Sequence, residues 1–249
     1  MEDRVTARKN PLIQKVRKLL SSAAYRRETG LFVGDGTKLL TEAVRYSPGL
    51  DTVILEESVQ TAPLPQGVRI VRVPGEIMEY ISPMQTPQGA VFLCRYPEKT
   101  QFLPRPGMLI LDGIQDPGNV GTILRTADAL DVPVVLLDGC ADPYGWKVVR
   151  SSMGAVFRTP VVQAKWEEVR QSCRQAGIEI GVTALSQRAV DIRTANLKKM
   201  ALVIGSEGRG VRKEILDEAD RELIIPMNEH CESLNAAIAA AIVMWQMKL

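Results

Sequence analysis

Three segments in the C-terminal half repeat one local pattern, and this pattern limits the folds open to the chain. Each begins with a short apolar run, turns at Gly, Pro or Asn, and leads into a helical pattern. The segments are 111–130 (LDGIQDPGNVGTILRTADAL), 202–211 (LVIGSEGRGV) and 223–242 (LIIPMNEHCESLNAAIAAAI). A parallel α/β sheet presents its ligand-binding loops in this way, at the carboxyl ends of its strands. The pattern therefore predicts a parallel α/β sheet with a site in these loops.

The rest of the chain extends the alternation of strands and helices. From residue 108 on, we expect strands at 108–111, 134–137, 157–162, 179–183, 201–204 and 222–225, and helices at 120–130, 145–152, 166–176, 213–218 and 234–247. Before it, the sequence predicts a smaller α/β unit with helices near 11–20, 38–46 and 76–81 and strands at 31–33, 53–55 and 69–73. The segment 97–107 has three prolines and little periodicity. We therefore expect domains at 1–98 and 108–249, joined by a linker at 99–107.

Composition is that of an ordinary globular protein. The 249 residues are 45% hydrophobic and 24% charged. The longest apolar stretch, 236–245, is about half the ~20 residues that a membrane span needs, and the charged N-terminus has no signal-peptide character. Four scattered cysteines without a CxxC pair and a single histidine argue against a zinc site. We expect a cytoplasmic protein with no metal and no membrane partner.

The first thirty residues are strongly basic, although the whole chain has a net charge of only +2. They hold three acidic residues and eight basic ones, namely Arg4, Arg8, Lys9, Lys15, Arg17, Lys18, Arg26 and Arg27. Clustered Lys and Arg side chains can neutralise phosphates and release counterions. Two interpretations remain open, an RNA-binding surface and a solvated helix face.

Polar residues follow the first two apolar runs. Asn119 ends the turn of the first segment and is a good N-cap for the next helix, and Arg125 lies about 9 Å further along that helix at 1.5 Å per residue. Its guanidinium can reach a phosphate or a substrate hydroxyl near the helix start, although an exposed helical arginine is the simpler alternative.

In the second segment, three glycines within 205–210 let the backbone approach a ligand. Glu207 is placed there to hydrogen-bond a substrate or to anchor the first loop.

The third segment ends a strand at Ile225-Pro226-Met227 and starts an alanine-rich helix near Ser233-Leu234-Asn235. Ser233 is a plausible N-cap of that helix. His230 lies between the two, and it is either a general base or, more simply, a solvated or structural side chain.

The order and wording of the three segments resemble the motifs of the SpoU/TrmH family of knotted (SPOUT) RNA ribose 2′-O-methyltransferases, over roughly residues 108–249. The resemblance implies a deep trefoil knot, S-adenosylmethionine (AdoMet) as cofactor and a homodimer through the knot region. By position, it assigns cofactor contacts to Gly205, Ile225, Met227 and Leu234, and a polar catalytic set to Asn119, Arg125, Glu207, Ser233 and Asn235. In the family the matching arginine is thought to help deprotonate the ribose 2′-hydroxyl. A free arginine stays protonated, so charge stabilisation is the safer physical role.

The N-terminal part resembles the family's substrate-binding domain, which is related to ribosomal-protein folds that bind RNA. The residues that carry this looser match are Asn10-Pro11, Arg17, Leu19, Arg26 and the run FVGDG at 32–36. We expect Arg17, Lys18, Arg26 and Arg150 to contact RNA, with a plain helix-end arginine as the simpler account of Arg150.

The expected function is AdoMet-dependent methylation of a ribose 2′-hydroxyl in ribosomal RNA, with large-subunit RNA favoured. One departure from the family is Glu229, which stands where many members have glycine and could alter the cofactor fit. Two alternatives remain open. One is a transfer-RNA ribose methyltransferase, and the other is a non-catalytic RNA-binding or ribosome-assembly protein that kept the fold.

Overall fold

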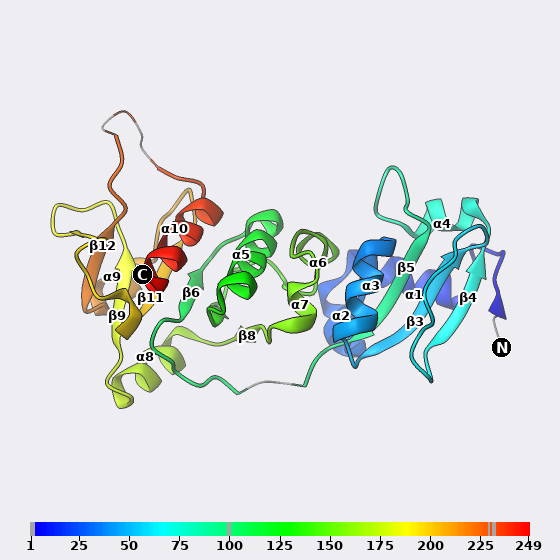
Figure 1. The fold of residues 1–249 in the computed structure, drawn as a ribbon, viewed down its shortest axis with the longest axis horizontal. Helices are drawn as coiled ribbons and strands as arrows, with labels where there is room; N and C mark the ends of the chain where they lie inside the picture. The colour runs from blue at the N-terminus through cyan, green and yellow to red at the C-terminus, as the bar shows by residue number, and fades with distance from the viewer. Residues whose placement is uncertain (1–2, 99–100, 229, 231–232) are drawn as a thin grey trace. The chain divides into compact units, whose positions relative to one another are not determined.

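The chain forms two compact units in the computed structural model, which describes residues 3–98, 101–228, 230 and 233–249 (Figure 1). The first unit comprises Met1–Glu98 and Asp142–Arg158, and the second comprises Lys99–Ala141 and Thr159–Leu249. The segment Asp142–Arg158, which the sequence analysis assigned to the C-terminal domain, therefore packs with the N-terminal part. The functional division into 1–98, 99–107 and 108–249 stays a prediction.

The first unit is built on a mixed sheet that has five strands among the described residues, in the order β1-β4-β3-β5-β2. The strands are β1 (Asp3–Arg4), β2 (Leu31–Asp35), β3 (Leu50–Glu56), β4 (Arg69–Val73) and β5 (Ala90–Arg95). β1, β4 and β3 run parallel, whereas β5 runs antiparallel to both of its neighbours. The helices are α1 (Pro11–Ser21), α2 (Ala23–Thr29), α3 (Thr37–Tyr46), α4 (Gly75–Ile81), α6 (Trp146–Ser151) and α7 (Ala155–Arg158).

Two different layers cover this sheet. On one side, apolar residues of α1 and α4 pack on strand residues, the helix residues being Ile13, Val16, Leu19, Ile77, Met78 and Ile81. The strand residue Phe32 belongs instead to an aromatic cluster, because its ring centroid lies 5.1 Å from that of Tyr144 and 6.1 Å from that of Phe157. The aromatic cluster therefore fixes Asp142–Arg158 to the sheet of the first unit.

Ion pairs strengthen the same attachment. Arg26 is only 6% exposed, and its Nε and Nη2 donate to Oδ2 of Asp142 at 3.0 and 2.6 Å. Its Nη1 donates to the Leu19 carbonyl at 2.6 Å, and Arg158 pairs with Glu42. Because a buried charge is tolerated only when it is paired and hydrogen-bonded, Arg26 is part of the interior of the first unit.

The second unit contains a sheet with seven strands in the described part of the chain, ordered β10-β12-β9-β11-β6-β7-β8, and every neighbouring pair is parallel. The strands are β6 (Leu109–Asp112), β7 (Val134–Leu136), β8 (Val162–Gln163), β9 (Glu179–Thr183), β10 (Val190–Asp191), β11 (Met200–Gly205) and β12 (Arg221–Ile224). The helices are α5 (Pro117–Leu130), α8 (Trp166–Gln175), the short η1 (Leu197–Lys199), α9 (Lys213–Glu218) and α10 (Ala236–Lys248).

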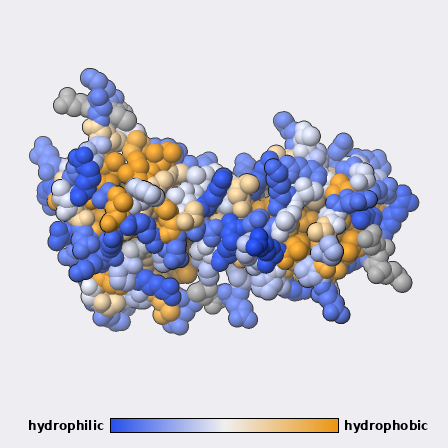
Figure 2. All heavy atoms as spheres, viewed as in Figure 1, coloured by the Kyte–Doolittle hydropathy of each residue, from blue (hydrophilic) through white to orange (hydrophobic). Residues whose placement is uncertain are grey.

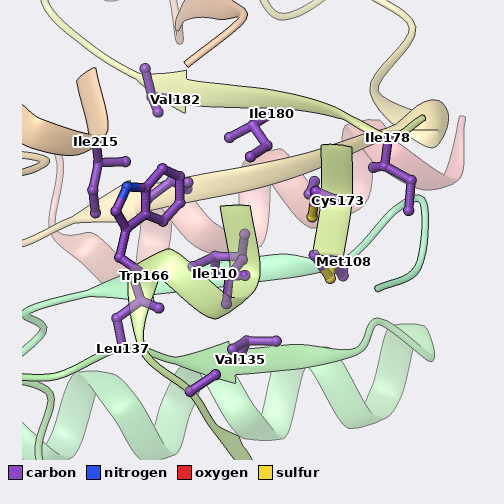
Figure 3. Close-up of a cluster of buried hydrophobic side chains, with 14 of the residues drawn as sticks. Met108, Ile110, Val135, Leu137, Trp166, Cys173, Ile178, Ile180, Val182 and Ile215 are labelled. Carbon is purple, nitrogen blue, oxygen red and sulfur yellow. The ribbon is translucent and has the colours of Figure 1, made fainter. Parts of the chain in front are cut away.

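Helices lie on both faces of this parallel sheet. Figure 3 shows Trp166 and Cys173 of α8 and Ile215 of α9 packed with Ile110 and Ile180 of the strands. Because successive strand residues point to opposite faces, the alternate strand residues face the other side. There α5 and α10 pack against each other, and α10 also contacts β11. The predicted α/β fold, with a parallel sheet and a smaller N-terminal α/β unit, is confirmed.

Several local predictions were wrong. Helix α5 begins at Pro117 and its N-cap is Asp116, whose Oδ1 accepts the Asn119 N–H at 2.8 Å. The N-cap of α10 is Asn235 instead of Ser233, since its Oδ1 accepts the N–H groups of Ala237 and Ile238. The segment 157–162 is not a strand, because α7 extends to Arg158 and β8 begins only at Val162. Helix α2, strand β5 and the short elements β1, β10 and η1 were not predicted.

Candidate active site

A cavity of about 680 Å³ lies in the second unit, at the carboxyl ends of β9, β11 and β12. This is the edge of a parallel sheet at which ligands bind, and the volume is typical of small-molecule sites. Its wall combines apolar side chains with polar groups from three loops. All four residues assigned to the cofactor line it, namely Gly205, Ile225, Met227 and Leu234, and so do Glu207 and Ser233.

The glycine-rich loop after β11 forms one wall of the cavity. The Gly210 N–H donates to the Ser206 carbonyl at 2.9 Å, so the loop closes on itself. A Cβ on Gly205 would lie 2.1 Å from the carbonyl carbon of Gly210, and Gly210 has a φ of 66°. Both positions require glycine, the first for close approach of backbone and the second for its left-handed conformation.

A buried carboxylate holds the far end of this loop. Asp112, at the end of β6, is 1% exposed and lies opposite Gly205 in the β6–β11 ladder. Its Oδ2 accepts the Arg212 N–H at 2.8 Å, and its Oδ1 accepts Nε of the same residue at 2.6 Å. This pair was not predicted, because the two residues are 100 positions apart and only the ladder brings them together.

A chain of hydrogen bonds joins the three sequence motifs. Asn119 donates from Nδ2 to Oε1 of Glu207, which also accepts the Ala236 N–H at 3.3 Å. Asn235 donates from Nδ2 to Oδ1 of Asn119 at 3.0 Å. Glu207 thus links the start of α5 to the start of α10, where a negative charge also favours the helix dipole. Of the two roles open to Glu207, anchoring of the first loop is the one that the contacts favour.

Arg125 lies apart from the cavity wall. It is exposed on α5 and borders a second groove of about 650 Å³, together with Ile242 and Trp245 of α10. Within the described residues, Arg125 makes no hydrogen bond or ion pair that would occupy its guanidinium. The structure therefore brings together Asn119, Glu207 and Asn235, but it places Arg125 on a separate groove.

The residues expected to bind RNA differ in their accessibility. Arg17 and Lys18 are exposed on α1, and Arg150 is 43% exposed with Nη1 at 3.9 Å from Oδ1 of Asp35. Arg26 is buried and its guanidinium is engaged by Asp142 and Leu19. The expectation that Arg26 contacts RNA is therefore corrected, since it has no surface on which a phosphate could bind.

Other reactive side chains offer little alternative chemistry. Burial raises the pKa of Cys94 to about 12 and the pKa values of Cys140 and Cys173 to about 11, so these thiols stay protonated and weakly nucleophilic at neutral pH. His230 is exposed, and its backbone N–H donates to Oδ1 of Asn228 at 3.1 Å. Glu229 lies outside the described residues.

The described part of the chain contains neither a candidate metal site nor a candidate membrane-spanning helix. No group of three His, Cys, Asp or Glu side chains is arranged to hold a metal ion. No helix there has the length and apolar character to cross a membrane.

The geometry agrees with a comparison to known families. The model of the SpoU rRNA Methylase family matches residues 106–245, which include the whole cavity wall. The chain belongs to the SpoU rRNA methylase family. A second model, the MRM3-like substrate binding domain, matches residues 10–91 of this SpoU protein, within its first unit.

Individual relatives span nearly the whole SpoU chain. The 23S rRNA (guanosine(2553)-2′-O)-methyltransferase RlmP of Bacillus subtilis is 32% identical over 240 residues, covering 94% of this chain and 96% of RlmP. The mitochondrial rRNA methyltransferase 3A of Danio rerio is 28% identical over 94% of this chain and 67% of its own length. The crystal structure of an AdoMet-bound rRNA methyltransferase from Sinorhizobium meliloti superposes with a TM-score of 0.86 at 29% identity, over 99% of this chain and 97% of that one.

Proposed function

We propose that this protein is an AdoMet-dependent methyltransferase that methylates a ribose 2′-hydroxyl in large-subunit ribosomal RNA. The observation that carries the proposal is the cavity of the second unit, which lies within the segment matched by the SpoU rRNA methylase family. The similarity to RlmP, whose name gives a 2′-O-methylated guanosine of 23S rRNA, supports the choice of RNA and of the reacting hydroxyl.

The residues of the cavity fit a cofactor that is half nucleoside and half amino acid. Its apolar part, which includes Ile225, Met227 and Leu234, suits an adenine ring, and the loop at 205–210 offers backbone groups for hydrogen bonds. When bound, AdoMet supplies an activated methyl group, so the protein's contribution is mainly positioning. Gly205 lets the two ends of the loop at 205–210 lie against each other, because a side chain at this position would clash with the loop backbone.

The chain of Asn119, Glu207 and Asn235 holds the three loops in one arrangement beside the cavity. Arg125 lies outside the cavity wall, and we assign it the role of a positive charge that stabilises the ribose oxygen as its proton passes to water, because the guanidinium itself stays protonated. Ser233, on the exposed side of the wall, is a candidate hydrogen-bond partner for the ribose.

We also propose that the protein is a homodimer through α10 and that its C-terminal part forms a trefoil knot. The exposed apolar side chains Ile238, Ile242, Trp245 and Leu249 follow one stripe of α10, and Figure 2 shows hydrophobic residues gathered over this helix. Arg125 borders the same stripe, so a dimer would place its guanidinium at the subunit interface. A cytoplasmic location stays a prediction.

Methyl transfer tests the activity. Labelled methyl from AdoMet should enter unmodified ribosomal RNA with the wild-type chain, and Arg125→Ala should lower the rate by about 100-fold or more, the typical cost of removing one charge-stabilising group. Arg174→Ala is the matched control, because Arg174 is also an exposed helical arginine of the second unit. A rate for Arg125→Ala close to that of Arg174→Ala would remove Arg125 from the mechanism.

The same assay separates the alternatives. Label that enters transfer RNA but not ribosomal RNA would identify a transfer-RNA methyltransferase. No label in either RNA, together with no AdoMet binding by calorimetry, would leave a non-catalytic RNA-binding protein.

The dimer is tested by sedimentation. Trp245→Glu introduces a charge into the stripe and should convert the dimer to a monomer, whereas Leu103→Glu, at a 59% exposed site away from α10, should not. A wild-type chain that sediments as a monomer contradicts the proposal.

A further inference from the structure

We propose that one face of α1, together with the preceding loop, is a docking surface for the phosphate backbone of RNA. The surface consists of Arg8, Gln14, Arg17, Lys18 and Ser21, and we call it the α1 face. The inference rests on the proposed function, since it names the part of the first unit that holds the substrate.

The α1 face is a product of helix periodicity. Ile13, Val16 and Leu19 are buried against the sheet, so the exposed positions 14, 17, 18 and 21 fall on the opposite side of the helix. Arg8 belongs to this side as well, because its carbonyl accepts Nε2 of Gln14 at 2.7 Å. From Arg4 to Arg27 the chain has eight basic residues and no acidic one. The face therefore carries positive charge only.

The three cations of the face form no ion pair, unlike Arg4, Arg69 and Arg95 of the same unit. Arg4, Arg69 and Arg95 are exposed and form ion pairs with Glu57, Asp3 and Asp51. Arg8, Arg17 and Lys18 form none with any described residue, and this includes the exposed Glu76 and Glu79 of the neighbouring α4. These three cations are therefore available to an external anion, whereas Arg4, Arg69 and Arg95 are already paired.

Aromatic rings hold these free cations in place. The guanidinium carbons of Arg8 and Arg17 lie 5.0 and 4.9 Å from the centroid of the same ring, Tyr80, and Nη1 of Arg17 donates to the Tyr80 carbonyl at 3.2 Å. Lys18 Nζ lies 4.0 Å from the centroid of Tyr25. Cation–π contacts order these long side chains before a ligand arrives, which lowers the entropic cost of binding.

The chemistry of the face selects a polyanion with spaced phosphates. Guanidinium groups match phosphate oxygens in a two-point geometry, and several phosphates must be present to engage separated cations. The Tyr80 ring already interacts with two guanidiniums, so it serves as their support and not as a platform for a base. Contacts of this kind fix the position of an RNA without reading its sequence.

Binding of an unmodified 23S ribosomal RNA transcript to the full chain, measured over a range of salt concentrations, tests the assignment. For Arg8→Gln/Arg17→Gln, the Kd at about 100 mM salt should rise about tenfold, and the slope of log K against log salt should fall by about 1.4 to 1.8, since each phosphate contact contributes ~0.7 to ~0.9. Arg4→Gln/Arg69→Gln removes the same two charges from paired positions of the same unit and should change the Kd by no more than about twofold. The Kd for AdoMet and the melting temperature should stay at wild-type values.

Variants of Tyr80 test the role of the ring without changing the net charge. Tyr80→Phe keeps the ring and should bind RNA like the wild type, whereas Tyr80→Leu should weaken binding with all charges present. Equal losses in the two double variants, or no loss in either, would overturn the proposal. So would unchanged RNA binding combined with lost binding to phosphatidylserine vesicles, which would assign the face to a membrane surface. A wild type that binds RNA through this face without transferring methyl would reject only the proposed activity.

Discussion

Gly205 and Gly208 stand three residues apart in the loop of the cavity, yet they tolerate a side chain very differently. A Cβ at Gly205 would lie within 2.2 Å of backbone atoms of Gly210 and Val211, whereas a Cβ at Gly208 would meet nothing within 4 Å. Gly205→Ala must displace the loop. A misplacement of about 1 Å in a site can lower the reaction rate by up to ~100-fold. We expect its Kd for AdoMet to rise about tenfold or more, with Gly208→Ala near wild type, by calorimetry. Similar affinities for both variants would show that the loop does not shape the site.

At this scale the sequence predicted residue types better than residue roles. The glycines and the polar set were assigned from the motifs. Of that set, Glu207 and Ser233 line the cavity, and Asn119 and Asn235 join Glu207 through hydrogen bonds. Arg26 was wrongly assigned to RNA binding, because its partner Asp142 is 116 positions away and no local sequence pattern predicts this ion pair. Asn119 was misassigned as an N-cap, since Asp116 takes that role and frees the Asn119 amide to reach Glu207 and Asn235.

Asp112 at the end of strand β6 holds Arg212, the N-cap of helix α9, at the far end of the cavity loop. Asp112→Ala would leave the Arg212 N–H and Nε without their acceptor beside a buried strand, and a lost partner of this kind costs about 2 kcal/mol. We expect that decrease in the free energy of unfolding, measured in urea. Asp191→Ala, which breaks a more exposed local pair with Arg193, should cost less than about 0.5 kcal/mol. Equal losses would mean that the buried pair contributes no more than a surface one.

Elements were predictable where hydrophobic periodicity is strong. The alternation of strands and helices after residue 108 predicted most elements of the second unit, but it misplaced β8 and missed the short β10 and η1. β5 was missed because it is buried at five consecutive positions and so has no alternation of apolar and polar residues. Phe157 was assigned to a strand, yet its ring packs on Phe32 of the first unit, a contact that only the tertiary fold creates.

The chain passes between its two units three times, after residues 98, 141 and 158. The first unit therefore depends on a segment supplied from the middle of the sequence. Asp142→Ala would leave the buried Arg26 guanidinium without its carboxylate, and breaking a buried pair in this way costs about 3 kcal/mol. We expect the melting temperature of the first unit to fall, while AdoMet binding at low temperature is retained.

The control is Glu57→Ala, which breaks the exposed pair with Arg4 in the same unit and should leave its melting temperature near wild type. If Asp142→Ala melts like Glu57→Ala, the segment 142–158 is not needed to stabilise the first unit.

Synthesis on the ribosome gives the discontinuous unit a further consequence. Residues 1–98 emerge first, but Tyr144, Phe157 and Asp142 arrive only with the sixty residues that follow. At typical elongation rates this delay is about 3 to 12 seconds. During that interval the growing chain exposes Phe32 and the unpaired Arg26. The first unit is therefore synthesised first, but its packing is completed only after residue 158 has been added.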